Sequence, residues 1–426
     1  MKLESFWLDT APTFNGAEEG PVDGRADVAI IGGGFTGLST ALALAKRGAT
    51  VVVLEAGRLV GEASGRNGGQ CNAGTLQDYR SLVDSFGVER ARRYYQEFTD
   101  AVDSVERLAS EEHIDCDFNR RGKLKLASKP AHFNKMVQTF EALQADGVDP
   151  NVELVSPDCM RDEIGSNDYH GGLLQTTSAQ LHVGKFGSGL AEAAARRGVR
   201  LYESAPVTGL HRQSGGAWRI TTPRGSVDAA QTLIATGGSG SGPFGWFRRR
   251  IIPVGSFIVV TEPLGAERLG RLLPNRRSYV TSNNIGNYFR VTEDNRLLFG
   301  GRARFAMSNV KSDRESGYIL RDSLVRAFPE FADVRIDYCW GGSVDMSADR
   351  MPHAGQHKGL YYSMGYSGHG VQMAVHMGQI MTDMIDGNEH ANPWGELKWP
   401  PIPGHFGKPW FLPAVGAYYR IKDFLY

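Results

Sequence analysis

Cysteine is scarce in this chain: only four occur among 426 residues, at positions 71, 116, 159 and 339. They are scattered along the chain, and no two of them form a C-x-x-C pair. This distribution argues against a disulfide framework and against a zinc site, and it indicates a reducing compartment. We therefore expect no metal centre.

An excess of charge is also absent, since 47 basic residues balance 47 acidic ones. The balance gives no indication of nucleic-acid binding. No uncharged apolar run reaches the roughly 18 residues of a membrane span, and residues 1–7 lack the basic and apolar regions of a signal peptide. The sequence predicts a cytoplasmic protein of two or three domains with no transmembrane segment.

Glycine, by contrast, is abundant, with 53 residues, and three of them form a G-x-G-x-x-G pattern: Gly32, Gly34 and Gly37. The context strengthens a pattern that is weak alone. Residues 27–31 form an apolar run of strand length before it, and residues 38–47 form a good helix after it. The glycines permit a tight turn, a close backbone approach to a pyrophosphate, and close packing of helix on strand.

A second strand, residues 50–54, ends at Glu55 and completes a βαβ unit. The carboxylate of Glu55 accepts hydrogen bonds from ribose hydroxyls and repels a 2′-phosphate, so the ligand is FAD or NAD and not NADP. A purely structural turn is the alternative. The expected cofactor contacts of this unit are Gly32, Gly34, Phe35, Thr36, Gly37 and Glu55.

Residues 61–70 form a second loop of small residues, too long and flexible for an ordinary connection. Its glycines let the backbone approach a flat ligand, and Ser64 and Asn67 offer polar groups. A disordered surface loop is the alternative interpretation.

The βαβ unit together with Ala63-Ser64-Gly65-Arg66-Asn67-Gly68-Gly69 resembles the FAD-dependent amine and amino-acid oxidoreductases. This group includes D-amino-acid oxidase, sarcosine oxidase and glycine oxidase. The S-G-R-N-G-G-Q form is most similar to the γ-glutamylputrescine oxidoreductase branch. The resemblance implies further FAD contacts from Ala56, Arg58, Ala63, Ser64, Arg66, Asn67, Gly68, Gly69 and Gln70.

Residues 218–222 and 226–229 are predicted to form a hairpin. Two stretches after it resemble the same group. The first, residues 231–238, is an apolar strand that ends in small residues, like a second flavin signature. Residues 359–371 run from a short strand through a glycine-rich turn into a helix, whose N-terminus would stabilise negative charge on a flavin. The resemblance adds FAD contacts at Val207, Ala235, Thr236, Gly237, Gly342, Gly365, Gly368, His369, Gly370 and Val371.

The expected fold is α/β (α+β, two domains): a Rossmann-like FAD-binding domain and a separate antiparallel β-sheet substrate domain. The final residues, 393–426, are rich in Pro, Trp and Tyr and would wrap the core, cover the cofactor domain or mediate contacts in a homo-oligomer. We assign residues 20–80, 160–245 and 338–392 to the first domain, 81–159 and 246–337 to the second, and 393–426 to a C-terminal extension.

The resemblance implies oxidation of the C–N bond of an amine or amino acid, γ-glutamylputrescine-like, by hydride transfer to flavin N5. The imine product would hydrolyse to an aldehyde or keto acid, with dioxygen or a quinone as electron acceptor. A sarcosine or N-alkyl amino-acid oxidase or dehydrogenase, and a flavoprotein subunit without turnover, are the alternatives. A plain NAD dehydrogenase is disfavoured by the second and third glycine turns.

Four residues are candidates for the reaction. His369 lies in the last glycine-rich turn, and Tyr288 and Arg290 share one face of a strand. Arg290 or Arg302 would hold a substrate carboxylate. Some relatives tether flavin through a cysteine near the position of Gly342, but Cys339 does not align with it, so we expect non-covalent FAD.

Overall fold

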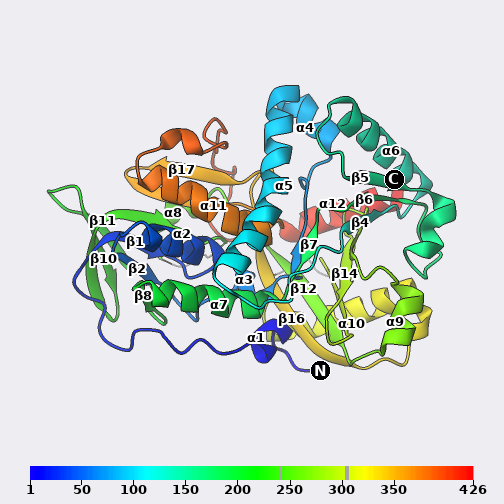
Figure 1. Ribbon diagram of the computed structural model, residues 1–426, viewed down its shortest axis with the longest axis horizontal. Helices are drawn as coiled ribbons and strands as arrows, with labels where there is room; N and C mark the ends of the chain where they lie inside the picture. The colour runs from blue at the N-terminus through cyan, green and yellow to red at the C-terminus, as the bar shows by residue number, and fades with distance from the viewer. Residues whose placement is uncertain (239–241, 303–306, 426) are drawn as a thin grey trace.

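The computed structural model describes residues 1–238, 242–302 and 307–425, and two large sheets organise this part of the chain (Figure 1). In the first sheet the central neighbours β18–β11, β11–β1, β1–β2 and β2–β8 all pair in parallel, which confirms the predicted Rossmann-like core. Its spatial order is β17 (His353–His357), β18 (Leu360–Met364), β11 (Gly225–Ile234), β1 (Arg25–Ile31), β2 (Val51–Leu54) and β8 (Arg200–Tyr202), with β10 (Trp218–Thr222) and β9 (Gly209–Arg212) attached to β11.

Both faces of this sheet are buried, as the continuous apolar strands require. Val28 and Ile30 of β1 face the helices, whereas Ala29 and Ile31 face a second cluster on the opposite side. Three helices supply the first face: α2 (Phe35–Lys46), α7 (Val183–Arg196) and α11 (Gly370–Ile385). Figure 1 shows α2 and α11 side by side, so the helices that follow the first and last glycine turns are neighbours.

The long helix α5 (Val88–Glu111) stands between the two sheets in Figure 1 and packs on α11. Its apolar stripe, which includes Phe98, Val102 and Val105, is buried in the same core as α2. The helix α6 (Pro130–Ala145) packs on the far strands of the second sheet.

The second sheet is antiparallel except for the parallel pair β13–β4. One face packs on α9 (Ala266–Leu272) and α10 (Val310–Ala327), and the other faces the first sheet. Its spatial order is β16 (Ile336–Met346), β12 (Ile252–Thr261), β15 (Leu297–Gly301), β14 (Asn287–Val291), β13 (Ser278–Thr281), β4 (Lys123–Leu126), β6 (Gly172–Gln175) and β5 (Val152–Val155).

Three details differ from the sequence-based expectations. The strands β6 and β16 belong to the second sheet, although the expected boundaries place residues 160–245 and 338–392 with the first. The hairpin strand and the strand of the second signature are one continuous strand, β11. The loop 61–70 is not open, because it contains a helical turn, α3 (Ala63–Arg66), and leads into β3 (Gln70–Cys71). The domain boundaries themselves stay a prediction.

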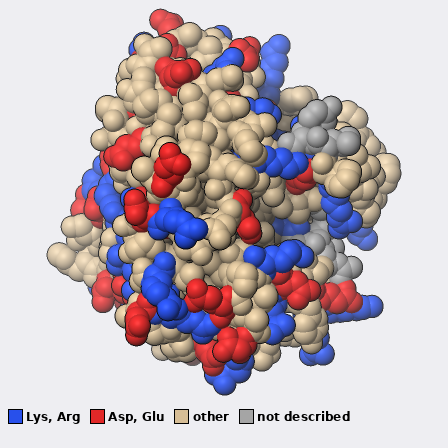
Figure 2. All heavy atoms as spheres, turned by 90° about the vertical axis from the view of Figure 1, so that its right-hand side faces the viewer, with Lys and Arg blue, Asp and Glu red and all other residues tan. Residues whose placement is uncertain are grey.

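The C-terminal helix α12 (Leu412–Leu425) packs against the second sheet through Asp423, which binds Asn284 in the β13–β14 turn. The remaining short elements are α1 (Phe6–Thr10), α4 (Tyr79–Phe86), α8 (Gly245–Arg248), β7 (Ala179–Gln180) and the 3₁₀ turns Pro157–Asp162, Pro329–Phe331 and Glu389–Ala391. Figure 2 shows acidic and basic side chains interspersed on one face. Within the described ranges no helix has the length and apolarity needed to cross a bilayer.

Candidate cofactor and substrate site

The first glycine turn leaves no room for side chains. Gly32, at the end of β1, has a φ of +111°, and a Cβ there would lie 2.5 Å from the carbonyl oxygen of Ala235. A Cβ on Gly37 would lie 2.0 Å from the carbonyl oxygen of Gly32. The turn therefore packs directly against the end of β11, and the first turn of α2 closes onto it.

Glu55 follows β2, as the motif predicts, and its carboxylate lies beside the glycine turn. Its two oxygens accept hydrogen bonds from the backbone N–H groups of Gly33 (2.7 Å) and Gly57 (2.8 Å). Burial raises the pKa of this carboxyl group, and the two N–H donors oppose that rise. Ala56 and Arg58 follow on the exposed side of the same turn, where Arg58 lines a small cleft with Leu59.

The second loop is joined to the first turn. Ser64 Oγ accepts a hydrogen bond from the backbone N–H of Phe35 (3.1 Å), and a Cβ on Gly34 would lie 2.9 Å from that oxygen. Asn67 folds the loop on itself: its Oδ1 accepts from the N–H of Gly69 (2.8 Å), while its Nδ2 donates to the carbonyl of Ser64. These contacts hold Ala63–Arg66 against the N-terminus of α2.

The loop is also joined to the second sheet. Arg66 Nε donates to the carbonyl oxygen of Gly341 (2.7 Å), and Trp340 Nε1 donates to the carbonyl oxygen of Arg66 (2.8 Å). A Cβ on Gly342 would lie 3.3 Å from Arg66 Cβ. Gln70 Nε2 donates to the carbonyl of Phe289 on β14 (3.2 Å).

The last glycine turn, between β18 and α11, meets the first one. The hydroxyl of Tyr366 lies 2.7 Å from Thr36 Oγ1 on α2 and 2.9 Å from Ser363 Oγ. Asp345 on β16 accepts a hydrogen bond from the N–H of Gly365 (2.7 Å), and burial raises the pKa of Asp345 to about 6. The turn carries Gly365, Gly368, His369, Gly370 and Val371, and it is thus fixed to both sheets.

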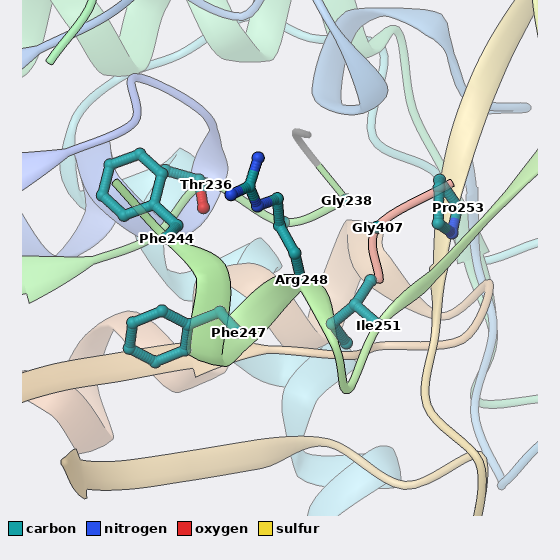
Figure 3. Close-up of a pocket in the computed structure, with 9 residues that line it drawn as sticks. Thr236, Gly238, Phe244, Phe247, Arg248, Ile251, Pro253 and Gly407 are labelled. Carbon is teal, nitrogen blue, oxygen red and sulfur yellow. The ribbon is translucent and has the colours of Figure 1, made fainter. Parts of the chain in front are cut away.

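The second flavin-like signature borders a cleft, shown in Figure 3. The cleft has about 270 Å³ of empty space, part of it open to solvent, and Thr236, Gly237 and Gly238 form one wall. In Figure 3 the guanidinium of Arg248 points toward Thr236 and Gly238. Val207 is buried in the core cluster that continues behind this wall.

Tyr288 lies between the second loop and the second sheet. A Cβ on Gly68 or on Gly300 would lie 2.9 or 2.4 Å from its ring, so both glycines are needed for the ring to fit. Its hydroxyl lies 3.0 Å from Ser256 Oγ, and burial raises the pKa of Tyr288 to about 12. The phenol therefore keeps its proton at neutral pH.

Arg290 shares that face but is committed to the backbone of the loop. Its Nη1 donates to the carbonyl oxygens of Gly69 (2.6 Å) and Leu181 (3.1 Å), and its guanidinium carbon lies 5.2 Å from the ring centroid of Trp7. Only 2% of the residue is exposed, and burial lowers the pKa of the guanidinium to about 10. These contacts indicate a residue that positions the flavin-side loop, rather than the substrate-binding residue that we expected.

Arg302, unlike Arg290, is not held by any residue that the structure describes. It follows β15, and because Gly300 faces the Tyr288 ring, Arg302, two residues further on, is directed to the same face. The residue is partly buried, and its side chain makes no hydrogen bond or ion pair with any described residue. Burial, together with the nearby Arg350, lowers the pKa of the guanidinium.

His369 lies at the start of α11 with its ring against Phe98, at a centroid distance of 5.3 Å. Its Nδ1 is buried and has no partner within the described residues. Burial lowers the pKa of the imidazole to about 3, with Lys123 as a further cause, so the ring is neutral near pH 7. A neutral ring with an open nitrogen fits contact with a polar ligand edge better than proton uptake.

Two lysines on β4 are site residues that the sequence reasoning missed. Leu124 and Leu126 face the second core, so Lys123 and Lys125 face the first sheet. Lys123 Nζ donates to the carbonyl oxygen of Ala73 (2.8 Å), and burial lowers the pKa of Lys123 to about 7. The sequence signal that could have identified these lysines is the strict Lys-Leu-Lys-Leu alternation, which predicts a strand with both lysines on one face.

The residues fit a bound flavin. The turns form a cradle of glycines, and several buried polar atoms beside it lack partners within the described parts of the chain. These atoms are His369 Nδ1, Asn72 Oδ1, Gln372 Oε1 and Ser343 Oγ. A flavin edge carries alternating donors and acceptors that such atoms complement. Within the same residues no group of three or more His, Cys, Asp or Glu side chains is placed to hold a metal ion.

The parallel sheet, the glycine cradle and the roofing second sheet together define a dinucleotide-binding oxidoreductase of the flavoprotein class. A model of the family of FAD dependent oxidoreductases (DAO) matches residues 27–384, and the chain belongs to this family. The enzyme class and the cofactor, FAD, are thus the ones that the sequence predicted.

Relatives at the sequence level support the same placement. The chain is 31% identical over 407 residues to the gamma-glutamylputrescine oxidoreductase of Escherichia coli, covering 93% of this chain and 92% of the relative. It is 31% identical over 386 residues to a probable oxidoreductase of Haemophilus influenzae, covering 89% and 88%.

Among solved structures, the glycine oxidase of Geobacillus kaustophilus aligns with a TM-score of 0.76 at 21% identity, over 90% of this chain and all of that one. The L-amino acid deaminase of Proteus myxofaciens, in complex with anthranilate, aligns with a TM-score of 0.72 at 17% identity, over 89% and 94%. At these identities the structural likeness shows the fold alone.

Proposed function

We propose that this protein oxidises the C–N bond of an amine that also carries a carboxylate, with a γ-glutamylputrescine-like molecule as substrate. One observation carries the proposal: the partly buried guanidinium of Arg302, which pairs with none of the described residues, shares a sheet face with Tyr288, whose ring packs against Gly68. A guanidinium in such a place pairs well with a planar carboxylate. The likeness to the E. coli enzyme supports the choice of substrate.

The side chains around this face favour a neutral amine. Bound FAD supplies the redox step by accepting hydride at N5, which requires a free lone pair on the substrate nitrogen. Arg302 places positive charge on the face, and nearby positive charge lowers the pKa of an ammonium group. Tyr288, which keeps its proton, donates a hydrogen bond and orients the substrate without removing a proton.

Oxidation of sarcosine or another N-alkyl amino acid is the second candidate. It is favoured by 25% identity over 378 residues to a sarcosine oxidase subunit beta of Rhodobacter capsulatus. A subunit without turnover is the third alternative. The electron acceptor, dioxygen or a quinone, the cytoplasmic location and a homo-oligomer stay predictions.

Anaerobic mixing of the purified flavoprotein with a panel of amines tests the proposal. We expect γ-glutamylputrescine to bleach the flavin absorbance faster than sarcosine or putrescine does. Faster bleaching by sarcosine would favour the second candidate, and no bleaching by any amine would favour the third. Readmitting air and measuring peroxide then separates an oxidase from a dehydrogenase.

We further propose that FAD is bound without a covalent link. Cys339 faces away from the site: it is fully buried in the second core, where its Sγ donates to the carbonyl oxygen of Asp313 on α10 (3.1 Å). Acid precipitation is expected to leave a yellow supernatant. A coloured pellet would contradict this proposal.

A further inference from the structure

The C-terminal helix α12 is fixed to the turn that leads into the strand of Tyr288. The carboxylate of Asp423 accepts hydrogen bonds from the backbone N–H of Asn284 (2.8 Å), from Asn284 Nδ2 (2.7 Å) and from the N–H of Ile285 (2.8 Å). Lys129 Nζ donates to the carbonyl oxygen of Asp423 (2.6 Å). Four hydrogen bonds at one residue set the position of the helix end on the second sheet.

The same turn lies beside Arg302. In the antiparallel pair β14–β15, Gly301 is opposite Asn287. The next step along this pair brings Arg302 opposite Gly286, which adjoins Ile285. The anchored end of α12 and Arg302 are therefore neighbours at the same edge of the sheet face.

One helical turn before Asp423, Tyr419 lies on the same side of α12. Arg350, in the loop after β16, donates from Nη2 to the hydroxyl oxygen of Tyr419 (3.2 Å). Both residues lie close enough to Arg302 to affect its charge, and Arg350 is one of the causes that lower the pKa of Arg302. Two guanidinium groups and a phenol thus gather where the chain end meets the second sheet.

Among the described residues, this cluster has no carboxylate of its own. Neither Arg302 nor Arg350 forms an ion pair with any residue that the structure describes, although the chain holds 47 acidic residues. Two guanidinium groups near one another repel unless an anion lies between them. A ligand with a carboxylate can therefore supply the negative charge that the described residues do not provide here.

We propose that Arg302, Arg350 and Tyr419 form a subsite for a carboxylate that the substrate carries far from its reacting C–N bond. This inference rests on the proposed amine oxidation. Arg302 is the inner and more buried ligand, and Arg350 is the exposed one at the mouth. The C-terminal helix, to which the sequence analysis gave three alternative roles and none at the substrate, is then one wall of the substrate site.

Two amines that differ in the distal carboxylate test the subsite: γ-glutamylputrescine and N-acetylputrescine. For Arg350→Gln we expect about tenfold weaker binding of the first in anaerobic flavin reduction, since charge-assisted hydrogen bonds are lost, and unchanged binding of the second. Tyr419→Phe is expected to weaken the first about threefold. Arg420→Gln, an exposed neighbour on α12, is the control and leaves both unchanged.

Equal losses for both amines, or no loss for γ-glutamylputrescine, would overturn the subsite. Titration with glutarate, followed by the change in flavin absorbance, separates this outcome from failure of the proposed reaction. Glutarate binding that Arg350→Gln weakens about tenfold, with no amine bleaching the flavin, would support the subsite and refute the oxidation. Bleaching by amines without glutarate binding would support the oxidation and refute the subsite.

Discussion

The part of the site that we assign to the cofactor (the cofactor side) and the part that we propose for the substrate (the substrate side) are built from different kinds of group. On the cofactor side, the glycine turn is built from backbone atoms without side chains. A Cβ added at Gly32 or Gly37 would lie 2.5 or 2.0 Å from a carbonyl oxygen. On the substrate side, charged side chains such as Arg302 and Lys123 project from separate strands into a buried face. The first side is specified by steric fit, and the second by electrostatics.

This difference has a consequence for mutation. A position that depends on steric fit tolerates no larger side chain, because the neighbouring backbone cannot move aside. A charged side chain, in contrast, can be replaced at a graded cost in binding free energy. We therefore expect changes on the cofactor side to abolish flavin binding, and changes on the substrate side to alter affinity or pH dependence while flavin stays bound.

The largest effect is expected for Gly37→Ala. The new Cβ would lie 2.0 Å from the carbonyl oxygen of Gly32 and would displace the turn whose N–H groups would hold the phosphates of FAD. We expect FAD affinity to fall by roughly two orders of magnitude, as the loss of one or two charge-assisted hydrogen bonds implies. The ratio of flavin to protein absorbance measures this, and far-UV circular dichroism checks that the chain is folded.

The matched control is Gly270→Ala in α9. No heavy atom lies within 4 Å of a Cβ there, and alanine stabilises a helix interior by about 0.5–1 kcal/mol. If both variants lose flavin alike, steric specification is not the property that distinguishes the cofactor side.

Arg302→Gln is expected to leave FAD bound and to raise the KM for γ-glutamylputrescine by about ten- to a hundredfold, because a charged hydrogen-bond pair is lost. Putrescine, which has no carboxylate, should be oxidised as before. Arg314→Gln, an exposed arginine on α10, is the control. Loss of flavin from the Arg302 variant would place this residue on the cofactor side instead.

Arg290→Gln probes the boundary between the two sides, because this charged residue holds the flavin-side loop. Its loss leaves the carbonyl oxygens of Gly69 and Leu181 without a donor, so we expect the free energy of unfolding to fall by about 1–3 kcal/mol. Urea titration measures the change. Unchanged stability together with a raised KM would show that Arg290 contacts substrate.

The smallest effect concerns Lys123 and pH. Burial lowers the pKa of Lys123 from its ordinary value of 10.5 to about 7 in the folded chain, so between these values the unfolded chain binds more protons. The free energy of unfolding therefore rises with pH from 7 upward, by at most about 1.4 kcal/mol per unit. Lys123→Met should remove this rise, and Lys398→Met, on the surface, should not. An unchanged pH slope in Lys123→Met would refute a buried, depressed lysine.

The sequence predicted the Rossmann-like βαβ unit and the cofactor class well because their determinants are local. Gly32 to Glu55 form one uninterrupted βαβ unit, and each glycine has a conformational or steric reason that is visible from its neighbours. The resemblance then supplied the second loop and the last turn. The helical turn at Ala63–Arg66 was missed, because it is stabilised by contacts with Phe35 and Gly341 rather than by its own propensity.

The substrate side was predicted less well because its residues come from strands far apart in the chain. Arg290 and Arg302 look alike in sequence, and only their surroundings show that one holds a loop and the other has no partner among the residues placed in the structure. In the sequence, nothing distinguishes Lys123 from other strand residues, and only the structure shows that its side of β4 faces the first sheet.

By itself, the sequence determined the Rossmann-like unit, the flavin class and the family, since backbone turns and hydrophobic periodicity act over short distances. The tertiary structure alone decided that β16 and β6 join the second sheet and that Tyr366 meets Thr36. It also decided that α12 brings Tyr419 to Arg350. Such contacts depend on which strands pair and which charges are buried together, and no local pattern encodes either.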